Sequence, residues 1–509
     1  METLDWLVIG IFFLALIGII VWVVKQKQND SADYFLGGRD ATWLAIGASI
    51  FASNIGSEHL IGLAGAGASS GMAMAHWEIQ GWMILILGWV FVPFYSRSMV
   101  YTMPEFLERR YNPQSRTILS VISLISYVLT KVAVTVYAGG LVFQQVFGIK
   151  ELWGIDFFWI AAIGLVVLTA LYTIFGGMKS VLYTSVLQTP ILLLGSLIIL
   201  VLGFKELGGW DEMMSICSAV TVNEYGDTMT QLIRDNNDPN FPWLGALVGS
   251  AIIGFWYWCT DQFIVQRVLS GKNEKEARRG TIFGAYLKLL PVFLFLIPGM
   301  IAFALHQKYI GAGGEGFLPM LANGTANADA AFPTLVAKLL PAGVKGLVVC
   351  GILAALMSSL ASLFNSSAML FTIDFYKRFK PETPEKKLVG IGQIATIVIV
   401  VLGILWIPIM RSVGDVLYTY LQDVQSVLAP GIAAAFLLGI CWKRTSAQGG
   451  MWGLISGMVI GLTRLGAKVY YSNAGEVADS TFKYLFYDMN WLFFCGWMFL
   501  FCIIVVIVV

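Results

Sequence analysis

The chain of 509 residues is 58% hydrophobic and only 12% charged, and its mean hydropathy is +0.76. Soluble domains are about 45–50% apolar and about 25% charged, so the composition excludes a water-soluble globular protein. The formal net charge of +1 provides no basic surface for nucleic acid. Six cysteines without CxxC pairs support neither a disulfide framework nor a zinc site. We therefore expect an all-α protein that is embedded in a lipid bilayer.

Apolar windows long enough to cross the hydrocarbon core, which takes about 20 residues, recur along the whole chain. Thirteen are predicted: 4–24, 43–65, 77–95, 118–147, 153–175, 180–204, 243–260, 281–305, 344–372, 388–409, 415–442, 449–469 and 491–509. The first is not a signal peptide, because Glu2 and Asp5 stand where a basic segment would precede it. The last reaches Val509 with no basic residue after it, so we expect either a truncated chain or a tail beyond Val509, which could hold a further span.

The distribution of lysine and arginine predicts the orientation of these spans, since cytoplasmic loops carry an excess of both. With the N-terminus outside, the cytoplasmic loops hold 20 of the 32 Lys and Arg residues and the outer loops hold nine. The sequence therefore predicts that the N-terminus is outside.

Two of the spans carry polar residues that are costly in a membrane and therefore indicate function. Span 43–65 has Asn54, Gly56, Ser57, Glu58 and His59 at mid-depth, which predicts an unwound helix lining a cavity. The alternative is a Gly/Ser face for helix packing. Span 344–372 contains Ser358, Ser359 and Ser362, with the carbonyl of Ala355 one turn earlier. These hydroxyls either bond back to their own helix or, together with carbonyls freed by an unwound partner, form a site for a hard cation.

Other polar or aromatic residues in spans leave two interpretations open. Glu78, after Trp77, is either functional or an interfacial carboxylate, and Lys288 is either functional or extended to the cytoplasmic edge. Tyr257 and Trp258 could belong to an interfacial aromatic belt. In span 415–442, the apolar face is interrupted by Gln422, Asp423 and Gln425.

Several long segments together resemble the sodium/glucose cotransporters of the sodium–solute symporter family. They are FASNIGSEHLIGLAGAG, YTMPEFLERRY, YWCTDQFIVQR, AYLKLLPVF, SSLASLFNSSAMLFTIDFY and the run ending AAAFLLGICWKR. The resemblance covers the whole chain, in order and with similar spacing. It implies a single transporter domain of the leucine-transporter type, with two inverted five-helix repeats and a substrate site at mid-membrane. The repeats would be 43–204 and 243–442, with span 4–24 before them and 449–509 after.

The resemblance also implies site residues. The sugar site would comprise Asn54, His59, Glu78, Tyr257, Trp258, Lys288 and Gln422. Aromatic gates would be Trp77, Tyr257 and Tyr418. At least one sodium ion would bind the carbonyls of Ala52, Ile55 and Ala355 and the hydroxyls of Ser358 and Ser359.

Two positions depart from the family pattern. The family's "YTDxxQ" reads YTSVLQ here, so Ser185 stands where relatives carry an aspartate linked to sodium passage or to a second sodium site. Gly254 lacks the polar side chain that some relatives place near the sugar. Both differences favour a one-sodium transporter or a different sugar preference.

The function implied by the resemblance is uptake of a monosaccharide, of the glucose or galactose type, driven by sodium across a cell membrane. Inositol, sialic acid, amino acids and small anions are rival substrates, and a sugar-gated channel or sensor is a rival class. A membrane hydrolase is a further rival, because Gly67–Gly71 (GASSG) matches the GxSxG pattern. Neither the preferred sugar nor the oligomeric state follows from the sequence.

Overall fold

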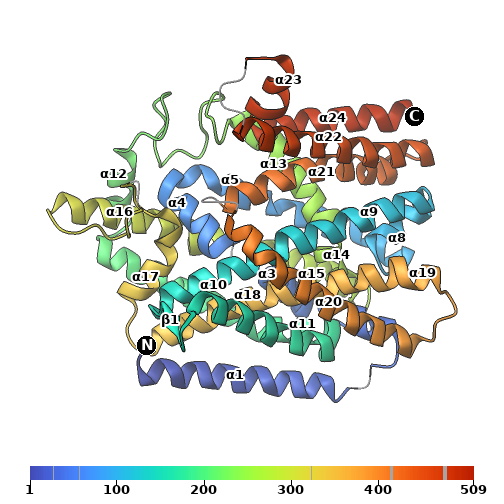
Figure 1. The fold of residues 1–509 in the computed structure, drawn as a ribbon, viewed down its shortest axis with the longest axis horizontal. Helices are drawn as coiled ribbons and strands as arrows, with labels where there is room; N and C mark the ends of the chain where they lie inside the picture. Colours follow the sequence, from blue (N-terminus) through green and yellow to red (C-terminus); the bar gives the residue numbers. More distant parts are fainter. Residues whose placement is uncertain (27, 57, 322–323, 413–416, 474–477) are drawn as a thin grey trace.

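The computed structural model describes residues 1–509 except 27, 57, 322–323, 413–416 and 474–477. The described chain is helical apart from its loops and a short antiparallel hairpin, β1 (Glu151–Leu152) with β2 (Ile155–Asp156). The longest helices lie side by side in one bundle (Figure 1). The helices are α1 (Thr3–Val24), α2 (Ser31–Leu36), α3 (Trp43–Asn54), α4 (Ala64–Ser70), α5 (Ala75–Ile79), α6 (Met83–Ile86), α7 (Val92–Ser98), α8 (Met103–Arg110), α9 (Pro113–Ser126), α10 (Ala133–Phe147), α11 (Phe157–Leu207), α12 (Trp210–Ser218), α13 (Trp243–Phe255), α14 (Gln262–Leu269), α15 (Glu274–Leu287), α16 (Ile297–Gly311), α17 (Ala331–Leu339), α18 (Val344–Met369), α19 (Lys377–Phe379), α20 (Glu385–Ser412), α21 (Leu417–Cys441), α22 (Ala447–Asn473), α23 (Thr481–Lys483) and α24 (Trp491–Val508).

Short segments wound more tightly or more loosely than an α-helix connect many of these helices. They are η1 (Gly37–Arg39), η2 (Glu58–Leu63), η3 (Gly71–Met74), η4 (Gln80–Trp82), η5 (Leu87–Phe91), η6 (Tyr127–Val132), η7 (Trp256–Thr260), η8 (Val292–Leu296), η9 (Ala328–Ala330), η10 (Leu370–Tyr376) and η11 (Tyr484–Asp488). Such interruptions are tolerated at membrane depth only where they are buried in protein or line a cavity.

The prediction of an all-α, multi-pass membrane protein is confirmed, whereas the count of thirteen spans is not. Among the described residues, nine helical segments are long and apolar enough to cross a membrane. One predicted span, 43–65, is divided into α3, η2 and α4 because polar and glycine residues interrupt it. The predicted spans 153–175 and 180–204 both lie within α11, which is 51 residues long and is broken between them at Gly177, whose backbone is not helical.

Helix α11 bends where its two predicted spans meet. Gly177 has φ 53° and ψ −149°, a conformation that L side chains rarely adopt. A Cβ atom there would also lie 2.4 Å from the carbonyl oxygen of Tyr34 in α2. Glycine is therefore required at this bend both by its backbone angles and by the close approach of α2.

The two ends of the bundle correspond to the predicted sides of the membrane. The N-terminus and α12 lie at one end in Figure 1, and α19 and the C-terminus lie at the other. Since α12 belongs to a predicted outer loop and α19 to a predicted cytoplasmic loop, the arrangement agrees with an outer N-terminus.

Packing at the centre of the bundle fixes the position of α3. Helix α3 lies against α15, α11 and α18, and α11 packs along α18. Helices α21, α22 and α24 pack with one another at the opposite edge of the bundle from α1 (Figure 1). The interruption after α3 is consequently enclosed by protein on several sides.

The outer loop between α12 and α13 folds over the segment that carries Trp77 and Glu78. Arg234 in this loop is buried, pairs with Asp238 and donates a hydrogen bond to the carbonyl of Ser70. Burial opposes ionisation of Asp238, but hydrogen bonds from the Phe241 N–H and the Asn223 amide hold its pKa below the usual range. The loop therefore keeps its ion pair at neutral pH.

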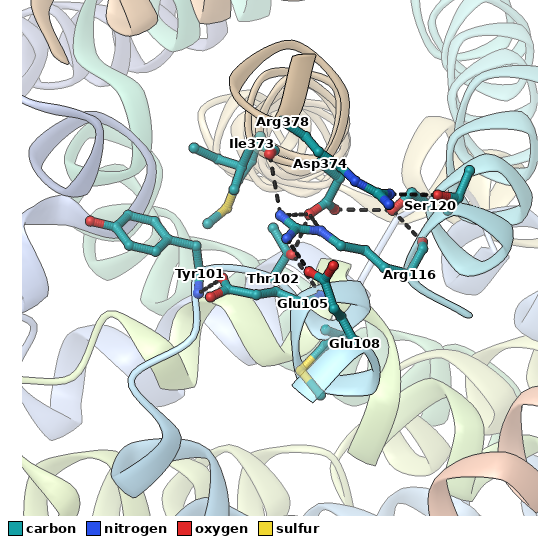
Figure 2. Close-up of polar contacts among 12 residues, drawn as sticks. Tyr101, Thr102, Glu105, Glu108, Arg116, Ser120, Ile373, Asp374 and Arg378 are labelled. Carbon is teal, nitrogen blue, oxygen red and sulfur yellow. Dashed lines mark hydrogen bonds and ion pairs between the residues drawn. The ribbon is translucent and has the colours of Figure 1, made fainter. Parts of the chain in front are cut away.

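At the cytoplasmic end, a polar network joins α8, α9 and η10 (Figure 2). The carboxylate of Asp374 accepts hydrogen bonds from Thr102 (2.8 Å), Ser120 (3.1 Å) and the Nε of Arg116 (2.8 Å). Arg116 also pairs with Glu108 at 2.6 Å. Because these groups satisfy one another, the network fixes the three elements together.

Candidate functional site

Helix α3 ends in the middle of predicted span 43–65. Its last residue is Asn54, Ile55 is extended (φ −78°, ψ 107°), and helical structure resumes at Glu58 as η2. The polar, glycine-containing stretch therefore does interrupt the helix, as the sequence predicts. An interruption of this kind frees main-chain oxygens for ligands.

A serine of α18 lies against this interruption. The hydroxyl of Ser359 donates to the carbonyl of Ser53 at 2.8 Å and lies 3.3 Å from that of Ile55. A Cβ atom on Gly56 would lie 2.9 Å from the same hydroxyl, so glycine permits the close approach. Ala52 and Ala355 are buried on the facing helices α3 and α18. Oxygens of the type that hard cations prefer thus converge here.

The other predicted hydroxyl, that of Ser358, lies toward α11. Its Oγ is 3.3 Å from the Oγ of Ser185, which itself donates to the carbonyl of Val181. Ser185 in turn lies 3.4 Å from the hydroxyl of Ser49, which accepts a hydrogen bond from Nε of the buried Arg267. A single hydroxyl, that of Ser49, therefore separates a fixed positive charge from Ser185, the position where the family pattern has an aspartate.

A second polar centre lies beyond the interruption, at Glu78 of α5. Nζ of Lys288 is 2.6 Å from one carboxylate oxygen of Glu78, and Nε2 of His59 is 3.3 Å from the other. Lys288 and His59 are also in contact at 2.7 Å. All three side chains are buried, so Lys288 does not extend to the cytoplasmic edge and Glu78 is not an interfacial carboxylate. Burial of a charged group is costly unless it is paired, and Lys288 and Glu78 provide each other with the opposite charge.

These residues border a small cavity of about 20 Å³, room for about one water molecule. Its lining also includes Asn54, whose amide donates to the hydroxyl of Tyr257 at 3.0 Å. Oδ1 of Asn54, Nδ1 of His59 and Oε1 of Gln80 are buried without a hydrogen-bond partner among the described residues. The cavity therefore offers unused donors and acceptors, but its walls must move apart to admit anything larger than water.

Most of the residues that the resemblance implies for the sugar site meet at this cavity. Asn54, His59, Glu78, Tyr257, Trp258 and Lys288 line it, as does Trp77 of the predicted gates. The indole of Trp77 packs edge-on against Trp491, with ring centroids 5.5 Å apart. The side chains of Gln422 and Tyr418 lie outside the part of the chain that the structure describes.

The cavity also includes residues that the implied site leaves out, namely Glu58, Gln80, Ile253 and Gln425. Glu58 and Gln425 are polar residues within predicted spans, and polar residues at such positions indicate function. Gln80 follows Glu78 by two residues and carries the same signal. A Cβ atom on Gly254 would lie 2.7 Å from Oε1 of Gln80, so Gln80 comes close to the place of the side chain that Gly254 lacks.

The GASSG match lies in the wrong structural context for a hydrolase. Ser69 belongs to helix α4, whereas a nucleophile elbow requires a turn from a strand into a helix. The described structure around Ser69 gives that motif no support.

Comparisons with known proteins identify the family of this chain. The model of the Sodium:solute symporter family matches residues 34–457. Human sodium/myo-inositol cotransporter 2 is 39% identical over 479 residues, which are 91% of this chain and 70% of that protein. Rat sodium/glucose cotransporter 2 is 37% identical over 512 residues, 96% of this chain and 75% of that protein.

Two solved structures share the architecture. A substrate-bound, outward-open Na⁺-coupled sialic acid symporter has a TM-score of 0.79 at 22% identity and covers 100% of this chain and 97% of its own. The transporter MhsT in complex with L-phenylalanine has a TM-score of 0.53 at 12% identity, with 92% of this chain and 98% of its own covered. The fold is thus the leucine-transporter type expected from the sequence.

The fold and the interrupted helix beside a buried polar cavity define a class, the sodium-coupled secondary transporters. The chain belongs to the Sodium:solute symporter family. It is a multi-pass membrane protein that couples sodium to the movement of a solute.

Proposed function

We propose that the protein takes up a neutral, polyhydroxylated ring, a hexose of the glucose or galactose type, together with sodium. The observation that carries this proposal is the cavity in which Glu78, Lys288 and His59 contact one another. Hydroxyls of a sugar both donate and accept hydrogen bonds, and a carboxylate, an ammonium and an imidazole together offer both. The ion pair also leaves the cavity without a large net charge, which suits a neutral solute better than an anion.

The sodium site proposed is the group of oxygens between α3 and α18. It comprises the carbonyls of Ala52, Ile55 and Ala355 and the hydroxyls of Ser358 and Ser359. Support comes from the contact of Ser359 with the carbonyls of Ser53 and Ile55. A cation here would hold α3 against α18 and so favour one arrangement of the bundle.

A stoichiometry of one sodium per solute is part of this proposal. Ser185 provides no carboxylate, and the buried guanidinium of Arg267 bonds to the neighbouring Ser49. A fixed positive charge in a region of low dielectric opposes the binding of a second cation.

One sodium ion is sufficient to concentrate a neutral solute. A membrane potential contributes about 2.3 kcal/mol per charge per 100 mV, and a tenfold sodium gradient adds about 1.4 kcal/mol. Together these correspond to accumulation of roughly a few hundredfold.

The structural organisation proposed is two inverted repeats, residues 43–204 and 243–442, around this site. Residues 4–24 precede them and 449–509 follow. The interruption after α3 and the looser turn η7 that carries Tyr257 then fall at the starts of the two repeats. In transporters of this type, discontinuous helices at the repeat interface form the substrate site.

Counterflow in proteoliposomes tests the proposal directly. Proteoliposomes that contain the purified protein are loaded with unlabelled glucose, galactose or myo-inositol. They should accumulate the labelled solute only when sodium is present. We expect a hexose to be preferred. Equal accumulation in choline or potassium medium would overturn sodium coupling, and sugar-gated current without net uptake would favour a channel.

Myo-inositol is the second candidate, because relatives at 36–39% identity are named sodium/myo-inositol cotransporters. Inositol is also a neutral ring of hydroxyls and suits the same cavity. Preference for myo-inositol over both hexoses in the counterflow assay would identify myo-inositol as the substrate.

A further inference from the structure

A groove on the membrane-facing side of the bundle shares no lining residue with the cavity proposed for the sugar. It is formed by α9, η10 and α20 and has a volume of about 590 Å³. A hollow of about 460 Å³ adjoins it and shares Leu124, Phe371 and Tyr376 with it. The lining is apolar except for Tyr376 and, at the end of the smaller hollow, Lys380.

The wall supplied by α20 has the length of one leaflet. Its lining residues Ile391, Ile394, Val398 and Leu402 recur at helical spacing and form one stripe. From Ile391 to Leu402 the helix rises about 16 Å. Half of the hydrocarbon core of a bilayer is about 15 Å thick. The stripe therefore matches the depth reached by a single acyl chain from one side of the membrane.

Basic residues stand at the cytoplasmic end of the groove. Lys387 precedes Ile391 by one helical turn and so lies on the same stripe of α20. Lys380 lines the smaller hollow, and both lysines are exposed. Lys377, in contrast, pairs with Glu385 at 2.9 Å. Two cations therefore remain at the mouth of an apolar groove in a loop that the charge distribution places on the cytoplasmic side.

The basic end is held in place by neighbouring polar contacts. Arg378 donates to the hydroxyl of Thr117 on α9 at 2.7 Å, which connects the start of α19 to the second wall of the groove. The network around Asp374 and Arg116 (Figure 2) fixes η10 to the same helix. Because α9 and η10 are fixed to each other, the groove is a preformed surface.

We propose that this groove binds a phospholipid of the cytoplasmic leaflet that has an anionic headgroup. One acyl chain lies along the α20 stripe between α9 and η10. The phosphate and the negative headgroup contact Lys380 and Lys387. The side chain of Phe379, which is 80% exposed, lies at the level where the acyl chain joins the lipid headgroup.

Native mass spectrometry of the purified full chain tests this proposal. The protein is released from nanodiscs of phosphatidylcholine with one quarter phosphatidylglycerol, and the lipid that remains bound is identified. Wild type should retain phosphatidylglycerol in preference to phosphatidylcholine. Each basic residue near an anionic lipid contributes about fivefold to binding, so Lys380→Gln with Lys387→Gln should weaken binding roughly 30-fold.

Two further variants distinguish lipid bound in this groove from anionic lipid attracted by any exposed cation. Val398→Trp fills the groove without changing the charge and should also release the lipid. Lys275→Gln with Arg279→Gln removes two equally exposed cations from another cytoplasmic loop and should leave binding unchanged. Equal loss in this control, retention by Val398→Trp, or no preference for phosphatidylglycerol in wild type would overturn the proposal.

Discussion

Two side chains in this protein combine a structural contact with a proposed contact to a ligand. The hydroxyl of Ser359 fixes the contact between α3 and α18 and is also a proposed sodium ligand. Glu78 is the shared partner of Lys288 and His59 and also borders the cavity proposed as the substrate site. Substitutions at such positions therefore need controls that distinguish lost ligand contacts from lost structure.

Ser359→Ala should abolish sodium-driven uptake while leaving protein in the membrane, because it removes one proposed ligand and alters little volume. Ser362→Ala is a matched control, since the Ser362 hydroxyl donates back to the carbonyl of Ser358 in its own helix at 2.7 Å and bonds to no other described residue. Sodium-dependent uptake of labelled sugar checks both variants. Full uptake by Ser359→Ala would remove this residue from the site.

Gln80→Ala should weaken sugar binding without changing the charge of the cavity. Gln80 presents a buried, unpartnered oxygen, and a neutral hydrogen bond contributes about 0.5–1.5 kcal/mol, or roughly 2- to 13-fold in affinity. The concentration of sugar at half-maximal uptake measures the change, with sodium affinity as the internal control. An unchanged sugar affinity would show that Gln80 does not contact the substrate.

Glu78→Ala should have a larger effect on sugar affinity, because it also leaves Lys288 buried without its carboxylate partner. Thermal stability in detergent must be measured beside uptake, since loss of this pair also destabilises the fold. The double variant Glu78→Gln with Lys288→Met removes both charges and should recover stability but not sugar binding. Recovery of both would show that the pair is structural only.

At the scale of elements, interruptions matter more than the helices themselves. The sequence predicts an unwound stretch within span 43–65, and α3 and η2 are indeed separate, where residues near Gly56 meet α18. A second break lies in α11 at Gly177, between the predicted spans 153–175 and 180–204.

Asp374→Asn should destabilise the cytoplasmic end of the bundle, because it leaves Arg116 partly buried with a weaker partner. Breaking a buried pair costs roughly 3–5 kcal/mol. Glu108→Gln is the matched comparison, because it removes the more exposed of the two carboxylates on Arg116 and should cost less. Thermal unfolding of the two variants should differ by several degrees, and equal melting temperatures would contradict a central role for Asp374.

For the whole molecule, the small cavity implies that transport requires rearrangement. A cavity of about 20 Å³ must enlarge before a sugar ring enters. Sodium at the α3–α18 contact would favour one arrangement and thereby change the affinity for sugar. Coupling between two ligands is reciprocal, so each must change the affinity of the other by the same factor.

Sugar and sodium affinities measured on one preparation should therefore show equal coupling factors. Wild type should move one positive charge for each sugar molecule, which reversal potentials in proteoliposomes report. Ser185→Asp places a carboxylate near Arg267, and we expect it to change the dependence of uptake on sodium. Two charges per sugar in wild type would contradict the proposed stoichiometry.

The sequence by itself determined that this protein lies in a membrane, that it is helical, and to which family it belongs. Composition and long motifs suffice for these conclusions, because burial in lipid constrains nearly every residue of a span. Most of the cavity lining was implied by the resemblance to the family, whereas the residues alone left Glu78 and Lys288 open to two interpretations. Only the tertiary structure decided that Lys288 and His59 share Glu78, that Gln80 belongs to the cavity, and that Arg267 bonds to Ser49 beside Ser185. Those contacts join residues more than a hundred positions apart or separated by a helix break, and packing alone determines which of them meet.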